Sequence, residues 1–375
     1  MMKIGIITSS LSKTNGWGRY SFEVIKGLKN FAETKVVSQP ILPPALSHPF
    51  KKICCLPKIM KHLKGCDIIH CLVEPYAQIT ALASKLLRKP FIINGVGTYA
   101  VEPLDTVIQG MGLKYAYRNA AKILCISRFT EQEILKRVSL KNTCVVNLGV
   151  DYDKFQKYGN MGRKSAEKTI ISVGALKNRK GYHISIPAVG EVKKRYPNLR
   201  YYIVGNQSGE NYFDELKNLV KQYNLEKNVT FLADISDDEL ISLYHQADLF
   251  LLTPINIDNN FEGFGLVYLE ANACGLPVIG TFDCGAEDII QNKYNGLIVP
   301  QGNIAQTAQA LLTLLDDPAF AQKLGENGKE IARKMSWENT INQYLKIYKS
   351  ILNAELPSTE VKVKMKKKFS SPAKI

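Results

Sequence analysis

Twelve short apolar segments, separated by stretches with helical periodicity, constrain the fold of this 375-residue chain more than any other feature. Short apolar runs that alternate with amphipathic helices are typical of parallel sheets covered on both faces. The chain is long enough for two such units, each with its own core. The sequence therefore predicts an α/β protein with two Rossmann-like parts. The segments are Ile4–Thr8, Lys35–Ser38, Asp67–Leu72, Pro90–Asn94, Lys122–Ile126 and Thr143–Asn147, then Thr169–Gly174, Tyr201–Gly205, Val229–Leu232, Asp248–Thr253, Pro277–Gly280 and Gly296–Val299.

The segment from Glu262 to Gly280, EGFGLVYLEANACGLPVIG, is the most informative local pattern. Glu262 stands beside a Gly-Phe-Gly turn, and Glu270 lies eight positions later in a predicted helix. At about 1.5 Å of helical rise per residue, this spacing is roughly 12 Å, close to the reach of a nucleotide sugar. The amides at a helix N-terminus favour an anion such as diphosphate. The element could hold a nucleotide sugar, or it could be an amphipathic helix with solvated glutamates.

Further motifs follow in a fixed order: a Gly-Leu-Pro turn at 275–277, then Gly285–Ile290 and Asn295–Val299. This series resembles the C-terminal signature of glycosyltransferase family 4, which comprises retaining enzymes with a GT-B fold. The resemblance implies two facing Rossmann-like domains with a donor cleft between them. It also implies transfer from a nucleotide-diphosphate sugar, UDP-sugar being favoured and GDP-mannose an option. The acceptor would be a glycan or a lipid-linked molecule in cell-envelope polysaccharide or glycolipid synthesis.

The resemblance also divides the chain. Residues 1–150 are expected to form an acceptor-side N-terminal domain and residues 151–335 a donor-side C-terminal domain, with the polar stretch 157–168 as an exposed connection. Residues 336–356 are expected to form a closing helix that crosses back to the first domain, although its apolar stripe could also pack on the second. The basic residues 357–375 are expected to lack fixed structure.

Three catalytic residues are implied by the resemblance: Glu262, Lys180 and Arg179. Glu262 would hold sugar hydroxyls, while Lys180 and Arg179 would stabilise the leaving diphosphate. The family usually has an arginine directly after the first glycine of the 174–181 loop, but Ala175 stands there. Arg179 or Lys177 is therefore expected to take over that role.

Other residues are expected to line the donor site. Glu270 would bind the ribose diol, and a helix beginning near Ser21 would follow the loop that resembles the family's Gly-Gly loop, in which Asn15 replaces the first glycine. The full donor-binding set is Gly16, Gly18, Lys177, Gly205, Ile235, Gly263, Phe264, Gly265, Leu266, Val267 and Glu270.

Two histidine positions leave alternatives open. Family members commonly carry a His-Gly-Thr triplet where this chain has Val96-Gly97-Thr98. His70 ends another strand and could point into the same cleft or be structural. Ser127 is expected to cap a helix near the cleft.

No metal or other cofactor is expected, since the chain has no Asp-x-Asp triplet and its eight cysteines show no metal-binding spacing. The cysteines are read as reduced core thiols.

The formal net charge of +15 suggests an anionic partner. Lysines gather at 51, 52, 58, 61 and 64 and in the tail. An anionic membrane surface, nucleic acid and the donor diphosphate are candidates, and the charge could also be ordinary solvated surface. We expect the donor, the acceptor and a membrane surface as partners, and no nucleic acid. The absence of a long apolar run and of a signal peptide predicts a cytoplasmic protein, with peripheral attachment to the inner membrane face as an option.

Two other functions compete with transfer. A nucleotide-sugar epimerase also uses two facing Rossmann-like domains, and a non-enzymatic protein that binds RNA or membrane would explain the charge alone. A dehydrogenase is disfavoured, because neither half has a Gly-x-Gly-x-x-Gly loop with an acidic residue about twenty positions later.

Overall fold

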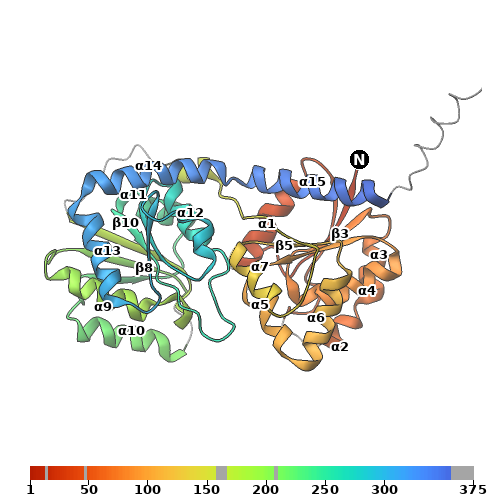
Figure 1. The fold of residues 1–375 in the computed structure, drawn as a ribbon, viewed down its shortest axis with the longest axis horizontal. Helices are drawn as coiled ribbons and strands as arrows, with labels where there is room; N and C mark the ends of the chain where they lie inside the picture. The colour runs from red at the N-terminus through yellow and green to blue at the C-terminus, as the bar shows by residue number, and fades with distance from the viewer. Residues whose placement is uncertain (13–15, 46–48, 158–166, 207–209, 356–375) are drawn as a thin grey trace, which may run out of the picture.

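The computed structural model describes residues 1–12, 16–45, 49–157, 167–206 and 210–355 of the chain. They form two lobes, each built around a six-stranded parallel sheet with helices on both faces (Figure 1). This architecture confirms the predicted α/β fold with two Rossmann-like parts.

The first lobe has the strand order β2-β1-β3-β4-β5-β6, and all neighbouring strands are parallel. Its central strands β3 and β4 are fully buried and β1 is buried after Lys3, whereas the edge strand β2 is mostly half-exposed, as expected for a strand with one neighbour. The elements are β1 Lys3–Ile7, α1 Gly16–Leu28, β2 Glu33–Val37, α2 Pro49–Ile53, α3 Leu56–Leu63, β3 Ile68–Cys71, η1 Glu74–Tyr76, α4 Ala77–Leu87, β4 Phe91–Gly95, α5 Thr98–Val101, η2 Glu102–Asp105, α6 Val107–Asn119, β5 Lys122–Cys125, α7 Arg128–Leu135 and β6 Thr143–Val145.

The second lobe has the order β12-β11-β10-β7-β8-β9 and is also parallel throughout. Its elements are α8 Tyr152–Gln156, β7 Thr169–Val173, η3 Asn178–Lys180, α9 Tyr182–Lys193, β8 Arg200–Val204, α10 Glu210–Gln222, β9 Val229–Leu232, α11 Asp237–Gln246, β10 Leu249–Leu251, α12 Leu266–Ala273, β11 Val278–Thr281, η4 Gly285–Asp288, β12 Gly296–Val299, α13 Ile304–Asp316, α14 Pro318–Lys334 and α15 Trp337–Glu355.

Each of the twelve apolar segments overlaps one strand, with ends that differ by one or two residues in several of them, because a strand buried on both faces is apolar at nearly every position. The first helix differs from expectation. It begins at Gly16 rather than near Ser21, so Gly16 and Gly18 belong to its first turn. Predictions that concern Asn15, Gln207–Gly209, the middle of the 157–168 connection and the tail lie outside the described residues.

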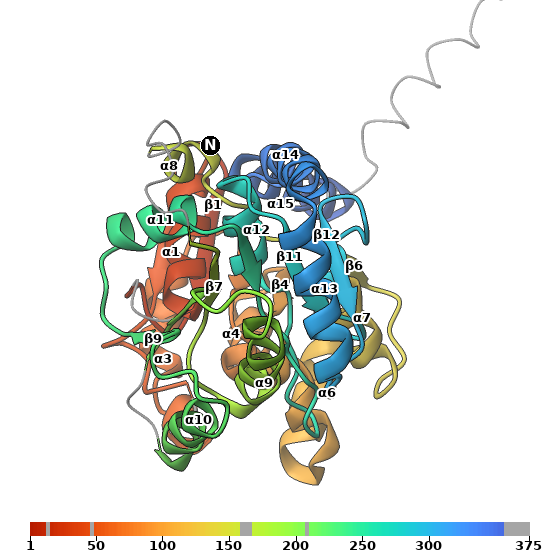
Figure 2. The same cartoon turned by 90° about the vertical axis from the view of Figure 1, so that its left-hand side faces the viewer.

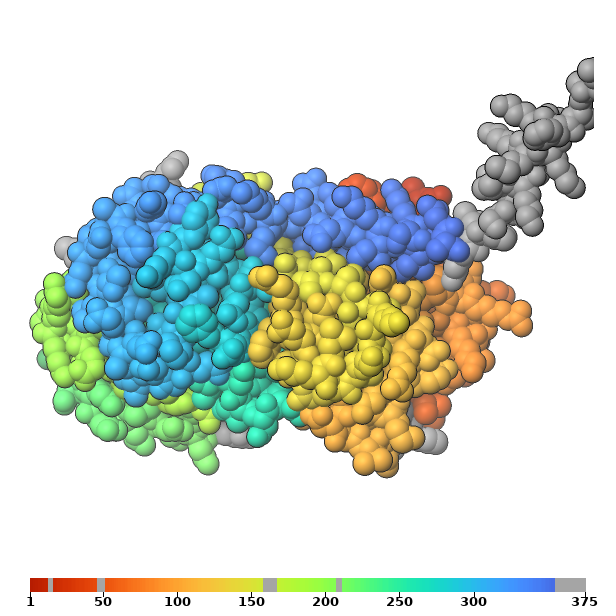
Figure 3. Space-filling view, viewed as in Figure 1, coloured from red at the N-terminus to blue at the C-terminus, as the bar shows by residue number. Residues whose placement is uncertain are grey.

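The last helix, α15, packs on the first lobe although it follows α14 of the second. Tyr344 and Tyr348 are fully buried, and the Tyr348 hydroxyl lies 2.6 Å from Nδ1 of His70 on β3. The Tyr344 hydroxyl accepts a hydrogen bond of 2.7 Å from Asn94 on β4. Figure 2 shows α14 and α15 together at one edge of the molecule, and Figure 3 shows them running along both lobes. The helix therefore ties the two lobes together on the side opposite α6.

Candidate donor site

The turn at Glu262–Gly265, which we call the donor turn after its predicted role, leads directly into α12. Gly265 has φ of +81°, and a Cβ there would lie 2.6 Å from the ring of Tyr268, so only glycine fits this helix start. The helix begins at Leu266, so helical rise applies to only half of the interval between Glu262 and Glu270. The separation of roughly 12 Å between Glu262 and Glu270 was expected from helical rise along all eight positions, and it does not apply because the first four are not helical. Glu270 does lie in the helix, as predicted.

A compact charged cluster surrounds the Glu262 carboxylate. Lys180 Nζ lies 2.5 Å and Arg179 Nη1 3.2 Å from Glu262 Oε2. Lys180 and Glu262 are 9% and 8% exposed, and Arg179 is partly buried. The short helix η3 holds both cations at the end of the loop that follows β7. The three predicted catalytic residues thus lie in direct contact.

Burial and charge oppose each other in this cluster. Burial alone would raise the pKa of Glu262, but Lys180 and Arg179 outweigh it and hold that pKa below its ordinary value. Burial lowers the pKa of Lys180, while attraction to Glu262 acts in the opposite direction. The formal charge of the cluster is +1, so an anion that approached Lys180 and Arg179 would be attracted.

Glu270 is also buried and receives partners from both lobes. Tyr244 donates a hydrogen bond of 3.3 Å to Glu270 Oε2, and Arg19 Nη1 lies 3.8 Å from Oε1. Burial raises the pKa of Glu270, opposed by Arg19 and Lys154. Arg19 belongs to α1 of the first lobe and also pairs with Asp237 at 3.1 Å. Sequence reasoning missed Arg19 as a site residue, and its place one position after the predicted Gly18 was the only signal.

The remaining predicted donor residues are spread around this centre. Gly263 and Phe264 are buried in the turn, while Leu266 and Val267 are half-buried in the first turn of α12. Gly205 directly follows β8, and its amide donates to the carbonyl of Leu232.

Four predicted residues lie apart from the charged cluster. Gly16 is exposed and Gly18 is buried at the start of α1, and Ile235 is half-buried just before α11. Lys177 is exposed at the start of η3. The Lys177 carbonyl accepts a backbone hydrogen bond of 2.8 Å from the amide of Lys180. Among the described residues, the side chains of Lys177 and Ile235 form no hydrogen bond or ion pair with the Glu262 cluster.

The first lobe approaches the donor turn closely at Gly97. A Cβ on Gly263 would lie 3.0 Å from Gly97 Cα and 3.1 Å from the Val96 carbonyl oxygen. Ser127 caps α7 as predicted, and its hydroxyl also donates to the Gly263 carbonyl at 2.6 Å. Arg128 pairs with Asp288 of η4 at 2.9 Å. The donor turn is therefore packed against the first lobe.

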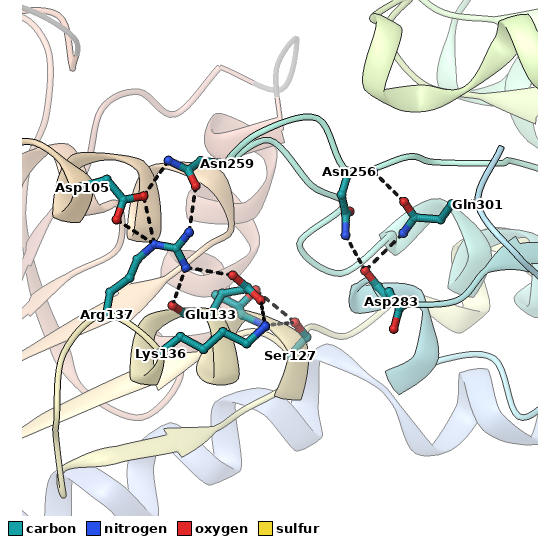
Figure 4. Close-up of polar contacts among 10 residues, drawn as sticks. Asp105, Ser127, Glu133, Lys136, Arg137, Asn256, Asn259, Asp283 and Gln301 are labelled. Atoms are coloured by element: carbon teal, nitrogen blue, oxygen red, sulfur yellow. Dashed lines mark hydrogen bonds and ion pairs between the residues drawn. The ribbon is translucent and has the colours of Figure 1, made fainter.

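The loop before Glu262 makes a second contact between the lobes. Arg137 donates to Asn259 Oδ1 at 2.8 Å, and Asn259 Nδ2 donates to Asp105 Oδ2 at 2.7 Å (Figure 4). Asp105 also pairs with Arg137 at 3.0 Å. On the far side of the loop, Asn256 donates to the carbonyl of Asp283. Polar contacts thus hold both flanks of the loop.

His70 is a structural residue. Its side chain is fully buried, and its two ring nitrogens lie within hydrogen-bond distance of Tyr348 and Asn94. Burial lowers its pKa to about 4. Val96 stands at the position of the family's histidine; its side chain packs against the hydrophobic core, and its amide donates to Glu74 Oε1. Neither residue supplies an imidazole to the cleft.

Comparisons with known proteins agree with this geometry. A family model described as "Glycosyl transferases group 1" matches residues 154–331. An uncharacterized glycosyltransferase of Methanocaldococcus jannaschii is 30% identical over 292 residues, covering 77% of this chain and 76% of the relative. The D-inositol 3-phosphate glycosyltransferase of Corynebacterium efficiens is 34% identical over 191 residues, which cover 50% of this chain and 44% of that protein.

Solved structures show the same fold at lower identity. A glycosyltransferase from Rickettsia africae superposes with a TM-score of 0.79 at 21% identity, covering 94% of this chain and 98% of the other. Anabaena HepE in complex with UDP gives 0.77 at 18% identity, covering 93% and 100%. The two-lobed fold, the match to the family model and the similarity along most of the Methanocaldococcus protein together show that this chain belongs to the group 1 glycosyltransferases of GT-B fold.

Proposed function

We propose that the protein is a retaining glycosyltransferase that uses a UDP-sugar, with GDP-mannose as the second donor to test. The Glu262–Lys180–Arg179 cluster carries this proposal, together with the start of α12 four residues after Glu262. Two cations and the free amides of a helix start form a site for a diphosphate. HepE has been crystallised with UDP and with UDP-glucose, which supports a uridine nucleotide as the donor.

In the proposed reaction, the acceptor hydroxyl oxygen forms a bond to C1 of the sugar while the bond from C1 to the diphosphate oxygen breaks. The nucleoside diphosphate leaves with the electron pair, and one of its phosphate oxygens takes the acceptor proton. Lys180 and Arg179 stabilise the developing charge, and Glu262 orients sugar hydroxyls. Glu270 binds the ribose diol. This mechanism requires no enzymatic nucleophile and no metal ion.

The donor and the stereochemistry can be tested together. Thermal-shift measurements with UDP, GDP and ADP identify the base, because a ligand of the native state stabilises it in proportion to ln(1 + [L]/Kd). The preferred UDP-sugar or GDP-mannose is then incubated with glycan and glycolipid acceptors, and the anomeric configuration of the product is read by proton NMR. An inverted product would refute the retaining mechanism. Conversion of the donor to an isomer without any acceptor would show an epimerase.

We further propose that transfer occurs at an anionic membrane surface, on a lipid-linked or envelope glycan. Lys51 on α2, Lys58 and Lys61 on α3, and Lys64 are exposed. At the start of α6, Val107 and Ile108 are 80% and 83% exposed. Basic and apolar side chains together suit a surface with acidic headgroups and an apolar interior. In the described residues, no helix is both long and apolar enough to span a membrane.

Vesicle sedimentation tests this attachment. Each basic residue near such a surface contributes on the order of 1 kcal/mol before screening, so several lysines can recruit the protein where one cannot. Charge reversal at Lys51, Lys58 and Lys61 should reduce partitioning onto anionic vesicles at low salt, whereas reversal at Lys193 and Lys194, at the C-terminal end of α9, should not. Removal of residues 357–375 should weaken binding without reducing transfer. Equal partitioning onto neutral and anionic vesicles would refute the proposal.

A further inference from the structure

Glu270 lies deep in the second lobe, and its carboxylate has few partners. The residue is 5% exposed, and the hydroxyl of Tyr244 donates to its Oε2 at 3.3 Å. Among the described residues, the Glu270 carboxylate accepts no other hydrogen bond. An ionised carboxylate has about four acceptor positions on its two oxygens. Most of the hydrogen-bonding capacity of Glu270 is therefore free for a ligand.

The counter-charge of Glu270 comes from the first lobe. Arg19 Nη1 on α1 lies 3.8 Å from Glu270 Oε1, and in the described part of the chain no other basic side chain comes within 4.0 Å of this carboxylate. Lys154 of α8 also attracts Glu270, but its ammonium is paired with Asp237 at 2.6 Å. At 3.8 Å the guanidinium attracts the carboxylate without a direct hydrogen bond, so the acceptor positions of Oε1 stay open.

A second carboxylate holds the guanidinium of Arg19. Its Nη2 pairs with Asp237 Oδ1 on α11 at 3.1 Å, while Nη1 faces Glu270 on α12. A planar guanidinium can face two carboxylates at once, whereas a lysine ammonium is a single point charge on a flexible stem. Arg19 therefore connects the first lobe to two helices of the second lobe.

The neighbours of Arg19 in α1 fix its backbone within the first lobe. Gly18 is buried, and a Cβ there would lie 1.9 Å from the Ser12 carbonyl oxygen, so only glycine allows this close approach. Tyr20 is 3% exposed, and its hydroxyl lies 3.2 Å from the hydroxyl of Tyr344 on α15. The position of Arg19 is therefore set by the first lobe and not by the carboxylates that it reaches.

Charged and titratable side chains from five helices surround Glu270 and the end of α12 beyond it. They are Arg19 on α1, Lys154 on α8, Asp237 and Tyr244 on α11, Cys274 at the end of α12, and Lys329 on α14. Burial raises the pKa of Glu270, and Arg19 has the largest of the opposing effects. Without Arg19, more of the Glu270 population would be protonated at a given pH. A neutral carboxyl accepts hydrogen bonds more weakly than a carboxylate does.

We propose that Arg19 is a positioning residue of the ribose site, which supplies from the first lobe the positive charge that keeps Glu270 an ionised acceptor for the ribose diol. The inference rests on the proposed donor role of Glu270 and adds a residue of the other lobe to it. The 2′- and 3′-hydroxyls donate to Glu270, while Arg19 acts through the carboxylate and contacts neither hydroxyl. Because Arg19 belongs to α1, movement of the lobes apart would withdraw this charge and weaken the hold on the ribose.

The probes are UDP and 2′,3′-dideoxy-UDP, or GDP and its dideoxy analogue if GDP gives the larger thermal shift. Kd values are measured by titration calorimetry on the full chain from about pH 6 to about pH 8.5. Both ligands carry the same diphosphate, so its titration cancels in the ratio of the two Kd values. In the wild type, the dideoxy compound should bind at least about tenfold more weakly at every pH, because it lacks the hydrogen bonds to a charged group.

Arg19→Met nearly keeps the length of the side chain and removes its charge. The ratio of Kd values should fall severalfold near pH 6 and recover as the pH rises, because Glu270 then ionises without Arg19. Arg19→Lys keeps the charge and should retain more of the ratio near pH 6. The Kd of dideoxy-UDP should change little in Arg19→Met, which also shows that the variant is folded.

Arg128→Met is the matched control. It removes another ion pair between the lobes, the one with Asp288 at 2.9 Å, and does not touch Glu270. Its ratio of Kd values should equal that of the wild type at every pH. A fall in this control as large as that in Arg19→Met overturns the proposal, because any contact between the lobes would then have the same effect.

The remaining outcomes separate this inference from the donor proposal. Equal weakening of UDP and dideoxy-UDP by Arg19→Met overturns the inference, since Arg19 would then act on the diphosphate or only join the lobes. A lowered ratio that does not change with pH overturns it too, because charge would not be what Arg19 supplies. A wild-type ratio that Arg19→Met leaves unchanged refutes Arg19 alone and leaves the donor site standing. Equal binding of the two ligands by the wild type refutes the ribose role of Glu270, and the inference falls with it.

Discussion

The buried ion cluster of Glu262, Lys180 and Arg179 leads us to a prediction about both the free energy of unfolding and the affinity for UDP. Replacing Glu262 with glutamine leaves Lys180 and Arg179 without their counterion. Lys180 is 9% exposed, so it cannot recover hydration without rearrangement. Removing one partner of a buried ion pair costs about 3–5 kcal/mol. We expect the free energy of unfolding to fall by an amount in that range.

Replacing Lys180 instead of Glu262 should lower the free energy of unfolding by a smaller amount. In Lys180→Met, Glu262 retains Arg179 at 3.2 Å, and the methionine still fills the buried space. The double variant, Lys180→Met with Glu262→Gln, removes both buried charges, so its cost should be well below the sum of the single costs. Urea denaturation followed by circular dichroism measures all three. Glu330→Gln is a matched control, because Glu330 pairs with Lys334 at 2.5 Å on the exposed surface, where a pair contributes about 0–1 kcal/mol.

UDP should restore part of the stability that Glu262→Gln loses. In Glu262→Gln, Lys180 is free to bind the diphosphate without breaking a pair, so UDP should bind roughly tenfold more tightly than in the wild type, equivalent to about 1.4 kcal/mol. Turnover of the UDP-sugar should nevertheless fall, because the sugar hydroxyls that Glu262 is proposed to orient would meet a neutral amide oxygen instead of a charged carboxylate. A UDP-induced rise in Tm that is smaller in Glu262→Gln than in the wild type, or fully additive single costs, would show that Lys180 does not exchange its carboxylate for the donor.

Three other results are expected. Glu270→Ala should weaken UDP binding by roughly ten- to a hundred-and-fifty-fold, the value of a buried charged hydrogen bond, and an unchanged Kd in calorimetry would exclude a ribose role. Lys180→Ala should lower turnover by roughly a hundred- to a thousand-fold while EDTA leaves wild-type turnover unchanged; loss of activity with EDTA would point to a metal instead. The pKa of His70 is lowered to about 4, so the unfolded state binds its proton first as the pH falls. The contribution of His70 to the free energy of unfolding should therefore fall by about 2 kcal/mol between roughly pH 7.5 and pH 5, measured as the change in the difference between wild type and His70→Gln; parallel pH profiles of the two proteins would contradict this.

The twelve strands could be predicted from the sequence because their burial is a local property of each segment. A strand such as β7, whose five residues are all buried, is apolar at most positions wherever the chain takes it. The same holds for α12, since Gly265 before it and Gly275 after it mark its ends. The motif around Glu262 is contiguous, so its helix and turn could be predicted as well.

Contacts between distant segments could not be predicted in this way. Glu262 and Lys180 are 82 positions apart, and the sequence suggested that they share a site only through a resemblance to a family. Arg19 lies on a helix of the first lobe and reaches Glu270 of the second. No periodicity or spacing links those two positions, because their distance depends on how the lobes are placed.

The sequence by itself determined the fold class, the strand segments and the donor turn, since each depends on backbone conformation and burial over a few neighbouring residues. Only the tertiary structure decided that His70 is buried between Asn94 and Tyr348, that Asn259 bridges to Arg137, and that Glu74 is buried with one oxygen unpaired among the described residues. These features arise where side chains from separate elements meet. Their energies depend on distances of a few ångströms between groups that the chain order leaves far apart.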